Sequence, residues 1–352
     1  MTGLPEWSRA WGEPVGHARV AVRPEDFRVD ERLGFAPAGE GPHLLVRVRK
    51  RRLSTARAMQ ALAGHWQVER RQMGHAGRKD RHALTTQWLS VPWPPGASLP
   101  PTGSIPLDQE PDARLEVIGV TRHRRKLPVG ALAGNDFQLT LRDVEASADA
   151  LRTRVVTIAR YGVPNYFGPQ RFGRDGDNLV RARRWFAGEA GPRSRNDRSM
   201  LLSAARAAAF NAILDDRVQA GDWCGAEPGE ILTLDGRGSV FMAESGDLRH
   251  NRLRAAGLRV HPTGALPGSP GRSLAPPPSL AARERAVLQD WDDLVEGLVD
   301  KRLEAARRAL RLSVRALAVR CLDGRTWRLS FRLMRGAYAT AVLRELVEWG
   351  DD

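Results

Sequence analysis

The stretch Gly74–Val91 reads GHAGRKDRHALTTQWLSV and joins a charged loop to a segment that favours a strand. One carboxylate, Asp80, stands among arginines and a lysine, in a loop whose backbone Gly74 and Gly77 make adaptable. Residues Thr85–Val91 are rich in β-branched and aromatic side chains and predict the strand. Because neighbouring cations favour the ionised carboxylate, Asp80 is a candidate nucleophile or base. The alternative is a solvated charge cluster in a turn.

Regular elements are predicted before and after this stretch. Alternating or β-branched patterns predict strands at Leu44–Arg49, Leu115–Val120 and Phe137–Leu141. Ser54 or Thr55 is expected to cap a helix between the first strand and the Asp80 loop. Apolar residues of that helix recur at helical spacing and are Ala58, Leu62 and Trp66. The first block of the chain therefore mixes strands and helices.

The middle of the chain has a different composition. Tyr161–Gly173 is a dense loop of Gly, Pro and aromatic residues. Asp197 is a candidate N-cap for a long, Ala-rich helix that ends near Gly221. Residues Pro262–Pro278 predict an irregular loop, with a disordered linker as the alternative. This block is expected to be mainly helical.

Regular elements are again predicted in the last fifty residues. Asp300–Arg311 is predicted to be a helix, and Val314–Cys321 and Thr326–Met334 are predicted to be strands joined by a turn at Asp323-Gly324. The side chains expected on the buried face of this hairpin are Trp327, Leu329, Phe331 and Leu333. A final helix is predicted to begin near Tyr338. Strands at both ends of the chain, with helices between, predict one sheet domain that carries an insertion.

The charge of the chain points to a polyanionic partner. Lysine and arginine total 55 against 41 acidic residues, a net charge of +14 over 352 residues. Such an excess favours nucleic acid, and the runs Arg47–Arg52 and Arg122–Lys126 concentrate it. The alternative is a general preference for arginine in the source proteome, in which case the protein has no RNA role.

Several classes of chemistry find little support in the sequence. There is no Gly-x-Ser-x-Gly elbow, phosphate loop or dinucleotide fingerprint, and residues 234–238 read as a hairpin turn. The two cysteines, Cys224 and Cys321, and the scattered histidines show no metal-ligand spacing. No apolar run is long enough for a membrane span, and no signal-peptide pattern is present. A cytoplasmic protein without metal or cofactor is therefore expected.

Seven short sequence motifs, each present once along the chain, carry a resemblance to a known family. They are PEDFRVDE at Pro24–Glu31, AGRKDRHALTTQ at Ala76–Gln87, HRRKL at His123–Leu127, GNDF at Gly134–Phe137, VPNYFGPQRFG at Val163–Gly173, RGAYAT at Arg335–Thr340 and LREL at Leu343–Leu346. In these strings the chain resembles the TruD family of tRNA pseudouridine synthases.

The resemblance implies a fold and an activity. The fold is α+β, with a pseudouridine-synthase catalytic domain of mainly antiparallel sheet at residues 1–158 and 309–352. An inserted α/β domain, the TRUD domain, occupies residues 159–308. The activity is the isomerisation of uridine 13 in tRNA to pseudouridine, with no cofactor. The protein is expected to be a monomer that binds tRNA and no membrane.

The resemblance also assigns residues to the site. Asp80 falls on the family's nucleophile, and Lys79 is expected to support its charge. Phe27, Asn135 and Tyr338 fall on positions that contact substrate, and we add Phe137. Bacterial members usually carry Phe at the position of Tyr338, so its hydroxyl requires a hydrogen-bond partner.

Three questions stay open at this point. The carboxylate can attack either C1′ of the ribose or C6 of the uracil. Phe27 and Phe137 are alternatively plain core aromatics. A non-catalytic RNA-binding protein with the same fold is the second hypothesis.

Overall fold

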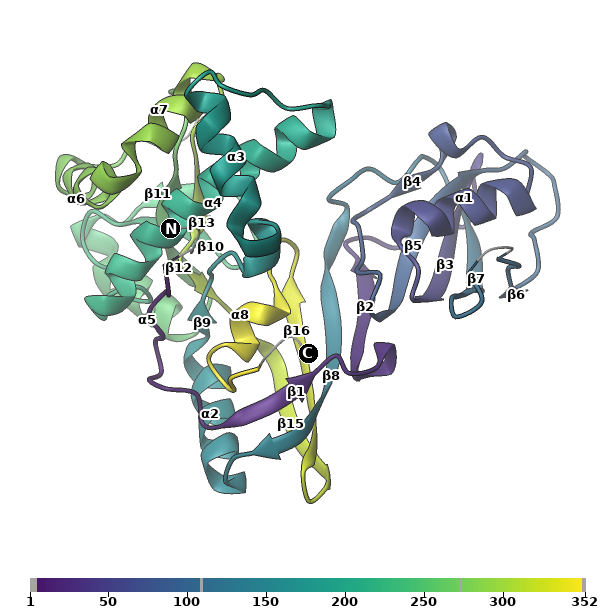
Figure 1. The fold of residues 1–352 in the computed structure, drawn as a ribbon, viewed down its shortest axis with the longest axis horizontal. Coiled ribbons are helices and arrows are strands. Elements are labelled where there is room, and N and C mark those ends of the chain that lie inside the picture. The colour runs from purple at the N-terminus through teal and green to yellow at the C-terminus, as the bar shows by residue number, and fades with distance from the viewer. Residues whose placement is uncertain (1–4, 108–109, 272–273, 350–352) are drawn as a thin grey trace. The chain divides into compact units, whose positions relative to one another are not determined.

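A computed structural model describes residues 5–107, 110–271 and 274–349 and has an α+β fold (Figure 1). The chain divides into two compact units, each built from several segments. Unit 1 comprises Met1–Pro14, Val156–Val314 and Ala337–Leu346, and unit 2 comprises Val15–Val155, Arg315–Gly336 and Val347–Asp352. The boundary at Val155 falls inside helix α2 (Ala148–Tyr161).

Unit 2 is organised around a ten-stranded sheet. Eight of its strands are hydrogen-bonded side by side in the order β15 (Arg315–Asp323), β16 (Thr326–Met334), β8 (Leu132–Glu145), β2 (Phe27–Leu33), β5 (Leu84–Pro92), β3 (His43–Arg51), β7 (Arg114–His123) and β6 (Gly103–Ser104). Two short strands pair with inner strands of this order: β1 (His17–Val20) with β8, and β4 (Gly74–His75) with β5. Strands β2 and β5 are parallel, whereas the other described pairs are antiparallel. The predicted strands and the mainly antiparallel sheet are confirmed.

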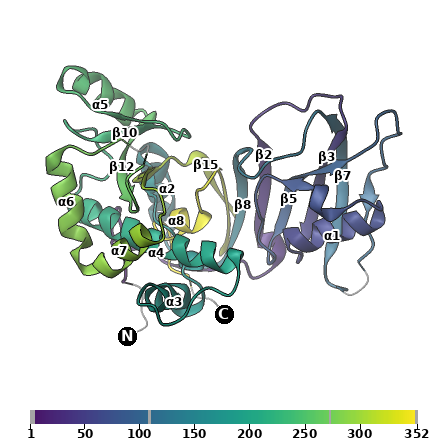
Figure 2. The ribbon, with the colours of Figure 1, turned by 90° about the horizontal axis from the view of Figure 1, so that it is seen from above.

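Helix α1 (Thr55–His65) lies across one face of β5, β3 and β7 (Figures 1 and 2). Ser54 caps it, since its hydroxyl accepts a hydrogen bond of 3.3 Å from the backbone N of Arg57. The alternation of β3 turns every second side chain toward this helix. The buried side chains that α1 shares with these strands are Leu44, Val46, Val48, Ala58, Met59, Leu62, Leu89, Val91, Leu115 and Val117.

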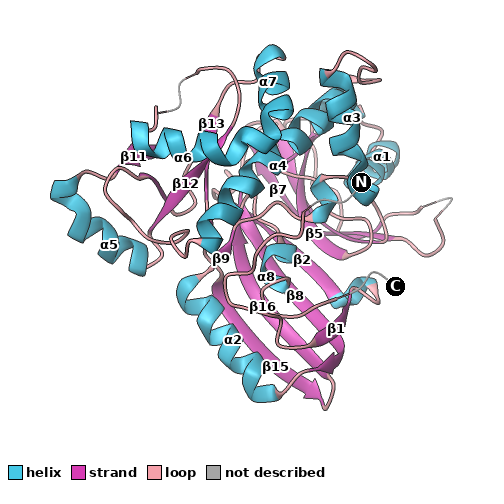
Figure 3. Cartoon of the chain, turned by 60° about the vertical axis from the view of Figure 1, so that its left-hand side comes forward, coloured by secondary structure: helices cyan, strands magenta, loops and turns pink. Residues whose placement is uncertain are grey.

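Strands β15 and β16 form the predicted hairpin beside β8 (Figure 3). Asp323 holds the turn, because its Oδ1 accepts hydrogen bonds from the backbone N of Arg325 and Thr326. All four side chains expected to be inward are buried: Trp327, Leu329, Phe331 and Leu333. The alternation along β16 is therefore confirmed.

Unit 1 combines helices with two small antiparallel sheets. The helices are α3 (Asp177–Phe186), α4 (Arg195–Gln219), α5 (Leu248–Ala256), α6 (Pro278–Leu288), α7 (Asp292–Asp300) and α8 (Ala339–Leu343). One sheet has the order β11 (Val240–Met242), β10 (Ile231–Leu234), β12 (Val260–Leu266) and β13 (Ala306–Ala309), and the other pairs β14 (Arg311–Leu312) with β9 (Val163–Pro164). The alanines of α4 let α3 and α7 pack closely against it around Leu201, Leu294 and Leu298.

Two predictions of secondary structure in unit 1 are wrong. Residues Asp300–Arg311 are not a helix: α7 ends at Asp300, Arg302 has a φ of 55°, and β13 then pairs with β12. The predicted loop Pro262–Pro278 instead contains most of β12 and the first residue of α6, and its residues 272–273 lie outside the described part. Sheet pairing with a distant strand overrides the local pattern in both places.

The cap of the long helix is also corrected. Ser194 is the N-cap of α4, and its hydroxyl accepts a 3.1 Å hydrogen bond from the backbone N of Asp197. The carboxylate of Asp197 pairs with Arg181, with a shortest distance of 2.7 Å. The helix ends at Gln219, and Gly221 adopts a φ of 74° just beyond it, as expected.

The units do not coincide residue by residue with the expected domains. The sequence places an insertion at residues 159–308, whereas unit 1 also includes Met1–Pro14 and Ala337–Leu346. The assignment of a catalytic and an inserted domain stays a prediction. No helix among the described residues is long and apolar enough to cross a membrane.

Candidate active site

The register of the sheet places three of the predicted residues on one face of unit 2. In an antiparallel pair, residues directly opposite each other project to the same side. Phe27 of β2 is opposite Leu139 of β8, and Asn135 of β8 is opposite Glu31 of β2. Phe137 lies between these positions on β8, two residues from Asn135, so it shares the face. Phe27 and Phe137 are in contact, and Asn135 lies further along the same face, four residues from the partner of Phe27 on β8.

The two phenylalanines differ in their exposure. Phe137 is only 8 % exposed, and its ring stacks on Phe331 at a centroid distance of 5.2 Å. Phe27 meets the Phe137 ring edge-on at 6.3 Å and is half-buried. Phe137 is thus packed from both sides in the core, while Phe27 keeps part of its surface open to a ligand.

Asn135 has an acceptor without a partner. Its Oδ1 is buried and makes no hydrogen bond to any residue that the structure describes. Oγ1 of Thr85 and Nε2 of Gln87, on β5, are in the same situation. An unsatisfied buried polar atom costs about 1–3 kcal/mol. Strand β2 separates β5 from β8, so these unpaired donors and acceptors are spread over one sheet, and each requires a ligand or another partner to satisfy it.

Asp80 lies in the loop between β4 and β5, and its side chain is exposed. Oδ1 accepts a 2.8 Å hydrogen bond from the backbone N of His82, which orients the carboxylate as in an Asx-turn. Among the described residues, Oδ2 has no hydrogen-bond partner. One oxygen therefore fixes the side chain, and the other is available for chemistry.

A buried lysine holds the backbone of this loop. Lys50 of β3 has no exposed surface, and its ammonium donates to the carbonyl oxygens of Asp80 at 2.6 Å and Leu53 at 2.5 Å. A longer bond of 3.5 Å reaches the carbonyl of Lys79. Burial lowers the pKa of Lys50 to about 8, the charge of Asp80 acts in the opposite direction, and Lys79 lowers it further. Lys50 thus anchors the Asp80 loop to the sheet.

Lys79 is held by a carboxylate other than Asp80. Its ammonium forms an ion pair with Oε2 of Glu31, and both side chains are buried. Oε1 of Glu31 accepts a 3.1 Å hydrogen bond from the backbone N of Trp88. The backbone N of Lys79 donates to Oγ1 of Thr55 at 2.9 Å. Lys79 therefore ties the loop to β2, β5 and α1, and its expected electrostatic role stays a prediction.

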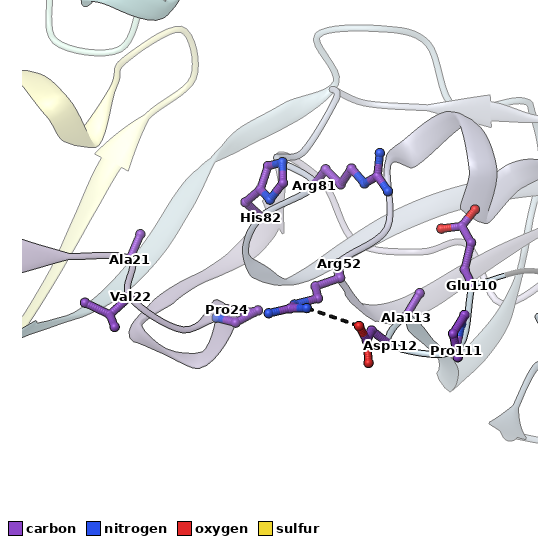
Figure 4. Close-up of a pocket in the computed structure, with 10 residues that line it drawn as sticks. All are labelled: Ala21, Val22, Pro24, Arg52, Arg81, His82, Glu110, Pro111, Asp112 and Ala113. Carbon is purple, nitrogen blue, oxygen red and sulfur yellow. Dashed lines mark hydrogen bonds and ion pairs between the residues drawn. The ribbon is translucent and has the colours of Figure 1, made fainter. Parts of the chain in front are cut away.

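A cavity of about 500 Å³ opens on one side of the loop (Figure 4). Arg81 and His82, which directly follow Asp80, line it together with Arg52. Across the cavity Arg52 pairs with Asp112 at 3.4 Å. Its charges are therefore mixed. Within the described residues, no group of three or more His, Cys, Asp or Glu side chains is placed to hold a metal ion.

Tyr338 belongs to unit 1, where it is the N-cap residue of α8. Its hydroxyl is bonded to the guanidinium of Arg171, which is the partner that the sequence required. Arg171 also lies 5.6 Å from the centre of the Tyr338 ring and bonds Oγ of Ser203 at 2.9 Å. Phe167 approaches the same ring at 6.3 Å. The guanidinium of Arg171 and the ring of Phe167 thus fix the orientation of the Tyr338 ring.

Sequence reasoning missed the buried contacts of Lys50 and Glu31 with the Asp80 loop in unit 2, and the contact of Arg171 with Tyr338 in unit 1. A signal existed for two of them. Lys50 continues the inward positions of β3 after Val48, and Glu31 continues those of β2 after Val29. A charged residue in an inward position of a strand requires a buried partner. Nothing in the pattern around Arg171 identified its contact with Tyr338.

The chain is similar to known proteins over nearly its whole length. The family model described as tRNA pseudouridine synthase D (TruD) matches residues 11–181 and 193–346. The chain is 42% identical to tRNA pseudouridine synthase D of Methylococcus capsulatus, covering 99% of this chain and 96% of the relative. It is 44% identical to the protein of that name in Nitrosococcus oceani, covering 95% and 91%.

A solved structure shows the same fold. It is the putative tRNA pseudouridine synthase D from Methanosarcina mazei, with a TM-score of 0.69 and 21% sequence identity. The match covers 98% of this chain and 96% of that chain. Together with the family model and the relatives above 40% identity, this similarity extends over nearly the whole sequence. The chain belongs to the TruD family of tRNA pseudouridine synthases.

Proposed function

We propose that the protein converts uridine 13 of tRNA to pseudouridine, with Asp80 as the nucleophile. The observation that carries the proposal is the Asp80 loop itself. It presents an exposed carboxylate, it is anchored from below by Lys50, and it lies in the same unit as Asn135, whose Oδ1 is unpaired. The relatives named tRNA pseudouridine synthase D support uridine in tRNA as the substrate.

The reaction needs a nucleophile and a pocket that holds the uracil, and it needs no co-reactant. The bond between N1 of uracil and C1′ of ribose breaks, and a bond between C5 and C1′ forms. The proton lost from C5 is balanced by the proton that N1 gains, so substrate and product are isomers. A carboxylate that attacks C1′ or C6 divides this change into two easier steps. Asp80 supplies that carboxylate.

The remaining residues hold the base. Enzymes that act on a stacked base extract it and bind it by stacking and by hydrogen bonds to its edge. We assign stacking to Phe27 and Tyr338, and recognition of the uracil edge to Asn135, whose amide offers both a donor and an acceptor. Phe137 supports Phe27 from the core, as their edge-on contact suggests. Lys79 favours the ionised form of Asp80 while it pairs with Glu31.

We further assign the catalytic domain to residues 1–158 and 309–352 and the inserted TRUD domain to residues 159–308. The resemblance to the family implies this division, and the change in composition of the middle block supports it. We propose that the insertion contributes to the choice of tRNA, and that the protein acts as a cytoplasmic monomer without a cofactor. Size-exclusion chromatography with light scattering tests the monomer: a stable dimer at micromolar concentration contradicts it.

The test of the function uses purified wild type and Asp80→Asn on unmodified tRNA. Pseudouridine is mapped chemically at each position. We expect wild type to modify position 13, and the variant to be slower by more than about 10³-fold, as when a catalytic nucleophile is removed. An equally fast variant contradicts the role of Asp80. Modification at another position contradicts the assigned target, and binding of tRNA without any product favours the non-catalytic RNA-binding hypothesis.

A further inference from the structure

A second cavity, of about 530 Å³, lies in unit 2 between helix α1 and the segment that leads into the Asp80 loop. It adjoins the nucleophile loop, because Arg78 lines it and lies two residues before Asp80. Thr55, which also lines it, accepts the backbone hydrogen bond of Lys79. The lining residues are Thr55, Ala56, Met59, Arg70, Arg71, Met73, His75 and Arg78.

This cavity is strongly basic. Arg70, Arg71 and Arg78 line it, all three are exposed, and none of the described lining residues is acidic. Arg71 does pair with Glu69 at 2.6 Å, but both side chains are more than half exposed. Such a pair contributes about 0–1 kcal/mol and yields readily to a stronger anion. The arginines are therefore placed for a ligand with negative charge.

The cavity of Figure 4, on the Arg81 side of the same loop, provides the contrast. It contains Glu110 and Asp112. Asp112 pairs with Arg52 at 3.4 Å, and Glu110 pairs with Arg57 at 2.8 Å. Carboxylates inside a cavity repel an anion. Of the two cavities beside the loop, only the one lined by Arg70, Arg71 and Arg78 has the charge that a phosphate requires.

The N-terminus of α1 adds to the positive potential in this cavity, and the pKa of His75 responds to that potential. Thr55 and Ala56 are the first residues of the 11-residue helix α1, whose first turn carries no acidic side chain, so its backbone N–H groups add to the arginines. Burial, and after it the charges of Arg78 and Lys79, lower the pKa of His75. Nδ1 of His75 is buried and has no partner among the described residues.

We propose that this cavity binds a phosphodiester of the RNA backbone next to the uridine that Asp80 attacks. The inference rests on the proposed function, since it takes the RNA at Asp80 as its ligand. Arginine side chains bind phosphate oxygens through two parallel N–H groups, which fixes position as well as charge. Contacts to phosphate position the nucleic acid and carry no sequence information. The cavity therefore sets where the strand lies relative to the Asp80 carboxylate.

The first experiment measures the salt dependence of tRNA binding for wild type and for Arg70→Gln, Arg71→Gln and Arg78→Gln. Each lost phosphate contact should weaken binding and reduce the slope of log K against log salt by about 0.7–0.9. Arg325→Gln is the matched control, because Arg325 is exposed, pairs with Glu145 at 3.0 Å and lies on the β15–β16 hairpin. Slopes for all three variants equal to that of the control overturn the proposal.

The second experiment identifies the phosphate. Single methylphosphonate linkages, which are uncharged, replace the phosphates on either side of the target uridine in tRNA. Wild type should lose affinity at one of these linkages, and the Arg70→Gln/Arg71→Gln protein should show no further loss there. If the variant and wild type lose affinity equally at both linkages, the cavity does not bind either phosphate and the proposal fails.

Product formation separates this inference from the proposed function. If wild type forms pseudouridine at its usual rate but the arginine variants bind and react like Arg325→Gln, only the cavity assignment fails. If wild type forms no pseudouridine in tRNA, the proposed function fails first. We expect the arginine variants to raise KM and to keep most of kcat at saturating tRNA, because a contact held in both ground state and transition state affects binding alone.

Discussion

Lys50 is a buried cation at the end of strand β3, and it connects the core of unit 2 to the loop that carries Asp80. Replacement by Met keeps the length of the side chain and removes the donor to the carbonyl oxygens of Asp80 and Leu53. A displacement of about 1 Å at a reacting group costs about 10²-fold in rate. We therefore expect Lys50→Met to reduce kcat by about 10²-fold and to leave the tRNA affinity unchanged, measured by single-turnover kinetics and filter binding. An unchanged kcat contradicts the role.

The stability of the same variant provides an independent measurement. Burial lowers the pKa of Lys50 to about 8, so between pH 8 and its usual value near 10.5 the unfolded chain holds a proton that the folded protein lacks. The unfolding free energy therefore rises with pH in this window, by about 3 kcal/mol, and is unaffected below it. Urea unfolding at pH 7.5 and 9.5 spans about 1.5 pH units of this window and should show a gain of about 2 kcal/mol in wild type and no such gain in Lys50→Met. Equal gains in both proteins contradict the assignment.

Arg171 and Tyr338 form a second pair that acts at the scale of single residues. Tyr338→Phe removes the hydroxyl that accepts a hydrogen bond from the guanidinium of Arg171, and Arg171→Met removes the donor of that bond. Contacting residues couple by about 0.5–3 kcal/mol. In a double-mutant cycle followed by urea unfolding, we expect the two losses to overlap, with a coupling near 1 kcal/mol. Additive losses contradict the contact.

Among the elements, the pairing of β8 with β16 depends on a glycine. A Cβ at Gly134 would lie 2.2 Å from the carbonyl oxygen of Leu333, so Gly134→Ala must push the strands apart next to Asn135. We expect a loss of about 1–3 kcal/mol in unfolding free energy together with lower activity. Gly64→Ala in α1 is the control, because nothing lies within 4 Å of its Cβ, and it should stabilise by about 0.4–1 kcal/mol. Equal effects contradict the packing argument.

The elements also show which parts of the fold were predictable from sequence. Strands β3 and β16 were identified because burial of one face imposes alternation on residues such as Val46, Val48 and Leu329. Strand β5 is buried on both faces and was identified by its β-branched and aromatic residues. Strand β13 was mistaken for a helix, because its side chains are all half-buried and pairing with β12 determines its conformation. The N-cap of α4 was misplaced by three residues, since both Ser194 and Asp197 have capping side chains.

Sequence could identify those residues of the candidate site whose own side chain or motif points to a role. Asp80 was identified from the charges around it, and Asn135 and Phe27 entered through the family resemblance. Their location on one face became evident only from the register of β2 against β8. The inward strand positions of Lys50 and Glu31 indicate that each has a buried partner, but no local pattern identifies the partner as Asp80 or Lys79. Nothing local identifies Arg171 as the partner of the Tyr338 hydroxyl.

At the scale of the molecule, each of the two units has a core of its own, one around Leu62 of α1 and the other around Leu298 of α7. Compact units with separate cores usually unfold as separate cooperative steps. Calorimetry should therefore resolve two transitions. Deletion of a buried Leu side chain costs about 2–5 kcal/mol in the unit that contains it. Leu62→Ala should lower the midpoint of one transition and Leu298→Ala that of the other, whereas a single transition shifted by both substitutions contradicts independent unfolding.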